Sequence, residues 1–198
     1  GVEVLKDGLF NNEAGESLEN ISLPQTLEVI GNYAFKNTSI TEITIPVSVY
    51  SVGQGAFENC YDLEEVNIMT STWRDIQDKN FKNCESLKEI TIPSSIRTIG
   101  DEAFLDCSSM SKVTISRTAS LMKIGEKAFK NCSSLYEITI PVNVGDVTAG
   151  EIAIGDEAFA GCDLLVYIRI LRSQPASIGD NVFEPGSMLY VENSEGEI

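Results

Sequence analysis

The sequence predicts a solenoid, an elongated domain in which one short unit stacks repeatedly on copies of itself. Two observations lead to this prediction. A phenylalanine preceded four residues earlier by a glycine recurs along most of the chain, and a short segment of alternating apolar and polar residues follows each copy. The hydrophobic content of 42% is enough for a substantial core. Since a unit this short cannot bury its own apolar face, neighbouring copies must cover one another.

The spacing of the repeat identifies its class. Intervals between the phenylalanines run from 22 residues (Phe35 to Phe57) to 30 residues (Phe129 to Phe159). This spacing is typical of leucine-rich repeats and shorter on average than that of ankyrin or tetratricopeptide units. Phe81 fits the pattern with Gln77 in place of glycine, and Phe10 begins a weaker copy. The phenylalanines with glycine at the fixed offset are Phe35, Phe57, Phe104, Phe129, Phe159 and Phe183.

Each repeat contains a predicted strand. The segment from Leu87 to Pro93 is apolar at its first, fourth and sixth positions, which is the strand pattern of leucine-rich repeats. Because side chains alternate between the two faces of a strand, Ile90 and Ile92 point inward and Thr91 points outward. Proline then removes a hydrogen-bond donor and ends the strand. We therefore expect a parallel sheet whose outer face is polar and uncovered.

The Gly-x-x-Ala-Phe segment joins one strand to the next. It is too short for a full helix, so we expect a single helical or 3₁₀ turn with Ala and Phe pointing inward. The phenylalanines would then form a continuous spine. Each contributes roughly 1.5 to 3 kcal/mol when a neighbouring coil buries it.

These elements combine into one predicted fold: an α/β-type leucine-rich-repeat solenoid, right-handed, with a concave parallel sheet, short or 3₁₀/helical turns on the convex side, and seven to eight repeats. We expect a single domain over residues 1–198, with a degenerate first repeat at 1–24, regular repeats at 25–182 and a degenerate cap at 183–198. Residues 145–151 lengthen one repeat into a surface loop. The repeat around residues 69–79 should be irregular, since Pro and Gly are missing and Trp73 fills an apolar slot.

The repeat motif resembles a known family. Cys-x-x-Leu-x-x-Ile-x-Ile-Pro followed by Ile-Gly-x-x-Ala-Phe, as in Cys84 to Pro93 and then Ile99 to Phe104, is similar to the BspA-type leucine-rich repeats, also called the Treponema pallidum class. The resemblance covers nearly the whole chain. It implies a secreted or surface-displayed protein of a host-associated bacterium or parasitic protist, with several members linked to adhesion. The motif consists of core residues, so it identifies no ligand-binding residue.

The net charge of the chain limits the classes of partner that it could bind. Fourteen Lys and Arg against 30 Asp and Glu give a net charge of −16, which repels nucleic acid and anionic lipid. We expect no nucleic-acid partner, no membrane insertion of this segment, and a monomer. No apolar run approaches the roughly 18 to 20 residues that span a bilayer.

Enzymatic chemistry is not expected. The sequence contains no His, which excludes Ser-His-Asp and Cys-His catalysis and removes the commonest metal ligand. A pair of carboxylates for glycoside hydrolysis is possible in principle, but 30 acids make accidental pairs common. We therefore expect no catalytic residue, metal or cofactor.

The five cysteines occupy one slot of the repeat, so we expect a column of buried thiols that pack as small apolar groups. Disulfides are the alternative for an exported protein, whereas zinc ligands would come in close pairs.

The candidate ligand-binding face is the outer surface of the sheet, where differences between repeats could encode recognition. Equivalent residues should line up in columns about 4.8 Å apart. One column carries three successive glutamates, which should repel at up to about 1 kcal/mol per pair. The candidate residues in the two columns are Glu42, Thr44, Glu65, Asn67, Glu89, Thr91, Lys112, Thr114, Glu137, Thr139, Tyr167 and Arg169.

Three functions remain open. The first is a cell-surface or secreted module for adhesion or host-factor binding, in which the glutamate column contacts a basic protein or a cation. A solvated acidic face that only prevents self-association is the simpler interpretation of that column. The second is a structural spacer in a larger surface protein, and the third is glycan hydrolysis by two carboxylates. Further residues to inspect are Tyr136, Tyr167, Trp73 and the loop at 145–151.

Overall fold

The structure is a computed structural model that describes residues 1–11, 18–116, 119–141, 153–170, 177–183 and 188–191. It is a parallel β-sheet solenoid of the leucine-rich-repeat type. The predicted loop at 145–151 lies outside the described residues, as does much of the predicted C-terminal cap at 183–198.

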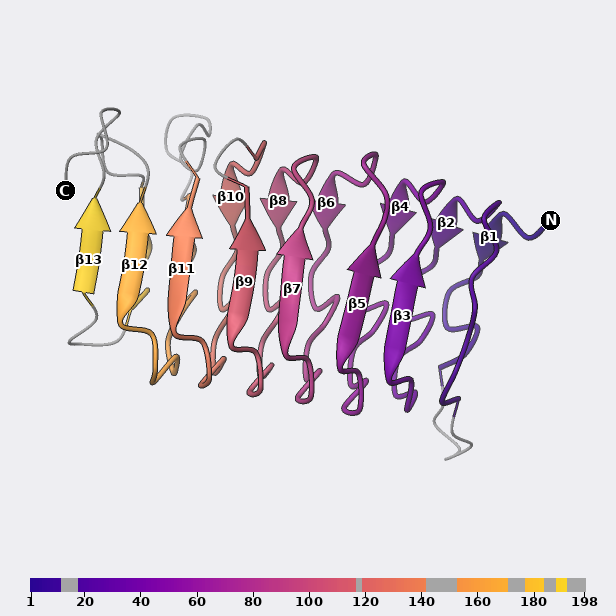
Figure 1. Ribbon diagram of the computed structural model, residues 1–198, viewed down its shortest axis with the longest axis horizontal. Helices are drawn as coiled ribbons and strands as arrows, with labels where there is room; N and C mark the ends of the chain where they lie inside the picture. Colours follow the sequence, from indigo (N-terminus) through magenta and orange to yellow (C-terminus); the bar gives the residue numbers. More distant parts are fainter. Residues whose placement is uncertain (12–17, 117–118, 142–152, 171–176, 184–187, 192–198) are drawn as a thin grey trace.

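The long sheet has seven described strands, which follow one another in chain order and form one layer (Figure 1). They are β3 (Glu42–Ile45), β5 (Glu65–Ile68), β7 (Glu89–Ile92), β9 (Lys112–Ile115), β11 (Glu137–Ile140), β12 (Tyr167–Ile170) and β13 (Met188–Val191).

Short strands of two residues form two further sheets on the other side of the coil, near the upper edge in Figure 1. One contains β1 (Val4–Leu5), β2 (Val29–Ile30) and β4 (Ser51–Val52). The other contains β6 (Asp75–Ile76), β8 (Thr98–Ile99) and β10 (Lys123–Ile124).

Every strand pair is parallel and joins equivalent residues of successive repeats. Ile90 of β7 is opposite Val113 of β9, and both are buried. Thr91 is opposite Thr114, and both are exposed. The predicted alternation of inward and outward side chains is therefore confirmed.

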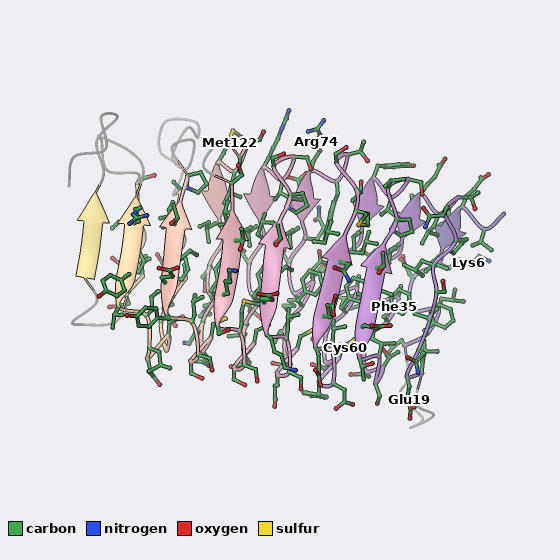
Figure 2. The ribbon with its side chains drawn as sticks, viewed as in Figure 1. Lys6, Glu19, Phe35, Cys60, Arg74 and Met122 are labelled. Atoms are coloured by element: carbon green, nitrogen blue, oxygen red, sulfur yellow. The ribbon has the colours of Figure 1, made fainter. Side chains whose placement is uncertain are left out.

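The phenylalanine spine is also confirmed and runs along the coil. Eight rings stack from Phe10 to Phe183, with consecutive centroids 5.0 Å (Phe104 to Phe129) to 5.4 Å (Phe159 to Phe183) apart. The six inner rings, such as Phe35 in Figure 2, are fully buried. Each ring fills the space between its two neighbours, so the coils depend on one another for burial.

The turn after each short strand is not helical. No α-helix or 3₁₀-helix occurs among the described residues, so the helical part of the expected fold is not confirmed. The backbone hydrogen bonds explain why. In one turn the amides of Tyr33, Phe35 and Asn37 donate to carbonyls of the next coil, at 2.8 to 2.9 Å. Because these amides donate to the neighbouring coil, none of them is left to form the i to i−4 hydrogen bonds of a helix.

Each turn that is described in full contains two residues in the left-handed region. In one coil these are Glu102 (φ 55°) and Asp106 (φ 63°). The second position is most often asparagine, the residue other than glycine that tolerates this conformation best. Its side chains form a ladder in which Asn59 Nδ2 donates to Asn37 Oδ1 (2.8 Å) and Asn83 Nδ2 donates to Asn59 Oδ1 (2.8 Å).

The repeated glycine before each turn has a different role from the one its position suggests. Gly100 does not have a left-handed φ, so turn conformation does not require it. A Cβ on Gly100 would lie 2.5 Å from Asp78 Oδ1 and 2.6 Å from Asp78 N of the preceding coil. Asp78 Oδ1 in turn accepts a hydrogen bond from Asp101 N at 2.9 Å. The glycine is needed because two coils approach each other closely there.

The irregular repeat around residues 69–79 is confirmed. Trp73 is buried with 1% of its surface exposed, and its Nε1 donates to the carbonyl of Asp75 at 2.7 Å. β4 and β6 belong to separate sheets, so the run of short strands is interrupted in this repeat. Asn80 stands where other repeats have Ala, and it bonds to Gln77 N through Oδ1 (2.9 Å) and to the carbonyl of Gly53 through Nδ2.

Candidate functional site

The outer face of the seven-stranded sheet presents the predicted columns. The twelve candidate residues lie on the face opposite the core, and all are exposed except Thr139, which is half-buried. The register places Glu42 opposite Glu65, Glu65 opposite Glu89, and Lys112 between Glu89 and Glu137. The alignment of the candidates is thus as the sequence predicts, while their role as a binding site is a proposal.

The negative charges of the three successive glutamates are only partly offset by neighbouring groups. Asn67 Nδ2 donates to Glu65 Oε1 at 2.7 Å. Just before β5, Glu64 forms an ion pair with Lys88, which precedes β7, on the exposed surface where such pairs contribute little. The column from Glu42 to Glu89 therefore keeps a negative field at its N-terminal end, which a cationic group would offset.

Met69 gives this part of the face an apolar component. It follows β5, and 61% of its surface is exposed. It borders an open depression over β5 and β7 that also includes Glu65, Asn67, Glu89 and Thr91. A partner side chain here would meet carboxylates and an apolar surface together.

Two tyrosines mark the other end of the face. Tyr136, just before β11, and Tyr167 of β12 form an edge-to-face pair with centroids 5.3 Å apart and an angle of 64°. Tyr136 is 50% exposed and Tyr167 41%. Desolvation and the hydrogen bond with Tyr167 raise the pKa of the Tyr136 phenol. Such rings combine a large apolar area with a polar tip, a feature of recognition surfaces.

The cysteines do not form a reactive site. All five are free and buried, in agreement with the packing interpretation. Each thiol donates to the carbonyl of the phenylalanine in the preceding coil, for example Cys60 Sγ to Phe35 O at 3.1 Å and Cys107 Sγ to Phe81 O at 3.2 Å. Burial raises the pKa of the Cys60 thiol to about 12, and it therefore lacks the thiolate needed for nucleophilic or metal-binding chemistry.

Within the described ranges, no three Cys, Asp or Glu side chains converge as metal ligands would. In the same part of the chain, no helix is long and apolar enough to cross a bilayer.

The structure places some residues differently from what the sequence analysis expected. Trp73 is enclosed in the core, so it cannot contact a ligand as it stands. Conversely, sequence reasoning missed the interruption between β4 and β6 and the exposed Tyr50 and Arg74 beside it. The missing proline and Gln77 in the glycine slot predict an irregular repeat here, but they do not show that its short strands part.

Comparison with known proteins agrees with this architecture. The profile of the BspA type leucine rich repeat region matches residues 3–119 and 68–190. The chain belongs to this family. The profile counts six copies, so the expected seven to eight repeats are not confirmed. A search of curated proteins found no match.

Several solved structures share the fold. The leucine-rich repeat protein of Treponema pallidum is 27% identical with a TM-score of 0.76, over 91% of this chain and 79% of that one. A leucine-rich cell surface protein of Faecalibacterium prausnitzii is 25% identical with a TM-score of 0.54, over 98% of this chain and 58% of that one. The pneumococcal vaccine antigen PcpA is 17% identical with a TM-score of 0.54, over 99% and 68%, and shows likeness of fold alone.

Proposed function

We propose that this protein is a non-enzymatic interaction module, secreted or displayed at the cell surface, that binds a protein or glycan through the outer face of its seven-stranded sheet. The observation that carries the proposal is the arrangement of that face. Its backbone is rigid and repetitive, yet its exposed columns change from three glutamates at one end to a tyrosine pair at the other.

Rigidity favours binding by such a face. Side chains held on adjacent strands lose little backbone freedom when a partner docks, so less of the interaction energy is lost to ordering. The glutamate column suits a basic segment of a partner protein, and charge complementarity would speed its association. Adhesion or capture of a host factor is the biological role that fits a surface-displayed module of this kind.

Location outside the cell is part of the proposal. It is supported by membership of the BspA-type family and by the likeness to a protein described as a cell surface protein. Five free thiols are unusual for an oxidising environment, and their burial offers a physical reason why they could persist there.

A spacer function is the second candidate. The uninterrupted spine from Phe10 to Phe183 makes the coil a stiff rod, which is what a spacer requires. A spacer would make no specific contact through its sheet, so the two functions differ in a measurable way.

The test measures binding of the full chain to a short lysine-rich peptide and to arrayed matrix proteins and glycans. One variant reverses the sheet charges at Glu42, Glu65 and Glu89 to Lys. Its matched control reverses Asp62, Glu85 and Asp163, three exposed acids outside the candidate columns. We expect the sheet variant alone to weaken peptide binding by roughly tenfold or more. Equal losses in both variants would indicate general charge attraction, and no bound ligand on any probe would favour the spacer.

A further inference from the structure

The long sheet is less tightly paired between β5 and β7, two strands that lie side by side in Figure 1. The pairs β3–β5 and β7–β9 are each in register over four residues. β5 and β7, by contrast, are paired at Glu65 and Glu89 alone. An open depression with a volume of about 610 Å³ lies over these two strands. This volume falls within the range of roughly 300 to 1,000 Å³ that ligand sites occupy.

Part of the lining of this depression is apolar. Ile68, the last residue of β5, is only half-buried, whereas its counterparts Ile45 and Ile92 in the neighbouring strands are 0% and 1% exposed. Met69 follows Ile68 and is 61% exposed. A ligand that covers Ile68 and Met69 removes apolar surface from water, which favours its binding.

The charged part of the lining is acidic. It consists of Glu64, Glu65, Lys88 and Glu89. Three carboxylates and one ammonium give a net charge of −2. The ammonium of Lys88 forms its ion pair with Glu64, while Glu65 and Glu89 are opposite each other in the register. Asn67 Nδ2 donates to Glu65 Oε1 at 2.7 Å and so orients that carboxylate. The depression is therefore complementary to a cation.

A second partly paired position shows what is particular to this one. In the described sheet, β9 and β11 are paired at Lys112 and Glu137 alone. Their opposite charges attract across the strands and offset each other. Of these two positions, the one at β5 and β7 alone brings two like charges together, and a cation bound there would relieve their repulsion.

The apolar and acidic parts of the lining together suit a positive charge at the end of an apolar stem. Long basic side chains have this form, because their methylene groups cover apolar surface while the charged head remains near water. Arginine fits better than lysine. Its planar guanidinium has five N–H donors, enough to bond two carboxylates on adjacent strands, whereas the lysine ammonium is compact and more strongly hydrated. A bare metal ion would leave Ile68 and Met69 uncovered.

We propose that the depression over β5 and β7 binds an arginine side chain of a partner protein, with Glu65 and Glu89 holding the guanidinium and Ile68 and Met69 contacting the stem. The proposal rests on the function proposed for the sheet face. It adds the position and the type of the partner side chain, and it selects a protein over a glycan as the partner.

Nuclear magnetic resonance of isotope-labelled methionine methyl groups provides a local readout. The chain has four methionines, of which Met69 lines the depression and Met110 is fully buried. The full chain is titrated with three short peptides that differ in one residue: arginine, lysine, or citrulline, the uncharged analogue of arginine. We expect the arginine peptide to shift the Met69 signal saturably and leave Met110 unchanged. The lysine peptide should bind roughly threefold more weakly, and the citrulline peptide should cause no shift.

Variants test the residues that hold the guanidinium. Glu65→Gln and Glu89→Gln should each weaken binding of the arginine peptide about two- to fivefold, the range for an exposed ion pair. Lys88→Gln should strengthen it by a similar factor, because the change removes the positive charge of the lining and frees Glu64. Glu42→Gln is the matched control, since Glu42 belongs to the same column but does not line the depression. Circular dichroism verifies that each variant is folded.

The outcomes separate this site from the wider function of the sheet. No shift of Met69, equal affinity for the arginine and lysine peptides, or a shift with citrulline would overturn the proposal. An equal loss in Glu42→Gln would also overturn it, because binding would then follow the charge of the whole column. Any protein that binds the sheet face and keeps its affinity for the Glu65→Gln, Glu89→Gln double variant would overturn this site and leave the function proposed for the sheet standing.

Discussion

Replacing Gly100 by Ala tests the physical origin of the repeated glycine. Since Gly100 has no left-handed φ, alanine meets no conformational strain there. If the glycine served only the geometry of the turn, the substitution would have almost no effect on stability. The close approach of the two coils predicts a large loss of stability. The added Cβ would lie 2.5 Å from Asp78 Oδ1, 2.6 Å from Asp78 N and 2.8 Å from Gln77 C, and two of these three atoms are backbone.

The magnitude follows from those contacts. Relieving the overlap requires the two coils to separate by several tenths of an ångström, and overpacking of this kind costs about 1 to 3 kcal/mol. The movement also strains the hydrogen bond from Asp101 N to Asp78 Oδ1 (2.9 Å), worth about 1 kcal/mol. We therefore expect Gly100→Ala to lower the free energy of unfolding by about 2 to 4 kcal/mol, measured by urea denaturation followed by circular dichroism.

A matched variant in the neighbouring turn should change stability in the opposite direction. Lys79 has a φ of 59°, so Lys79→Gly relieves left-handed strain and should stabilise the protein by up to about 1 kcal/mol. If Gly100→Ala costs less than about 0.5 kcal/mol, the close-approach argument is refuted, because that is the size of an ordinary surface effect.

Three further changes test other features of the fold. Asp106→Asn should stabilise the protein by about 1 kcal/mol in thermal denaturation, because the new amide can donate to Asn83 Oδ1 and continue the ladder; a lower melting temperature would contradict this. Burial raises the pKa of Cys60 from 9.0 to about 12, so the folded state binds its proton more tightly. The resulting stability should be complete below pH 9.0 and decline as the pH rises toward 12, with a smaller decline in Cys60→Ala. Glu65→Gln should stabilise the protein by up to about 1 kcal/mol at low salt and much less at high salt, and a gain that ignores salt would argue against repulsion between the glutamates.

Much of the fold could be predicted because stacking the equivalent residues of successive repeats fixes the register of the strands. Once Ile90 and Ile92 are assigned to the inside, Thr91 must point outward, and stacking equivalent residues brings Glu65 opposite Glu89. The same logic places the phenylalanines in a spine and the cysteines in a buried column. These predictions depend only on local alternation and on the length of the repeat.

The turns could not be predicted in the same way. A helical turn and the observed turn, which contains two left-handed residues, both place Ala34 and Phe35 inside, so the inward pattern does not distinguish them. The choice is made by hydrogen bonds to the next coil, such as Phe35 N to Ala56 O at 2.8 Å, and these join residues far apart in sequence. The same is true of Gly100, whose role depends on a neighbouring coil that its own sequence context does not describe.

The proposed binding surface on the sheet follows from the regularity of the repeat. On the sheet face the repeat is intact, so specificity can come only from the variable side chains that it aligns, as with Glu42, Glu65 and Glu89. In one repeat the short strands part between β4 and β6, where Gln77 replaces the glycine of the motif. The interruption affects one side of the coil only, because Phe57 and Phe81 still stack with centroids 5.2 Å apart, and the sheet face on the other side keeps its alignment.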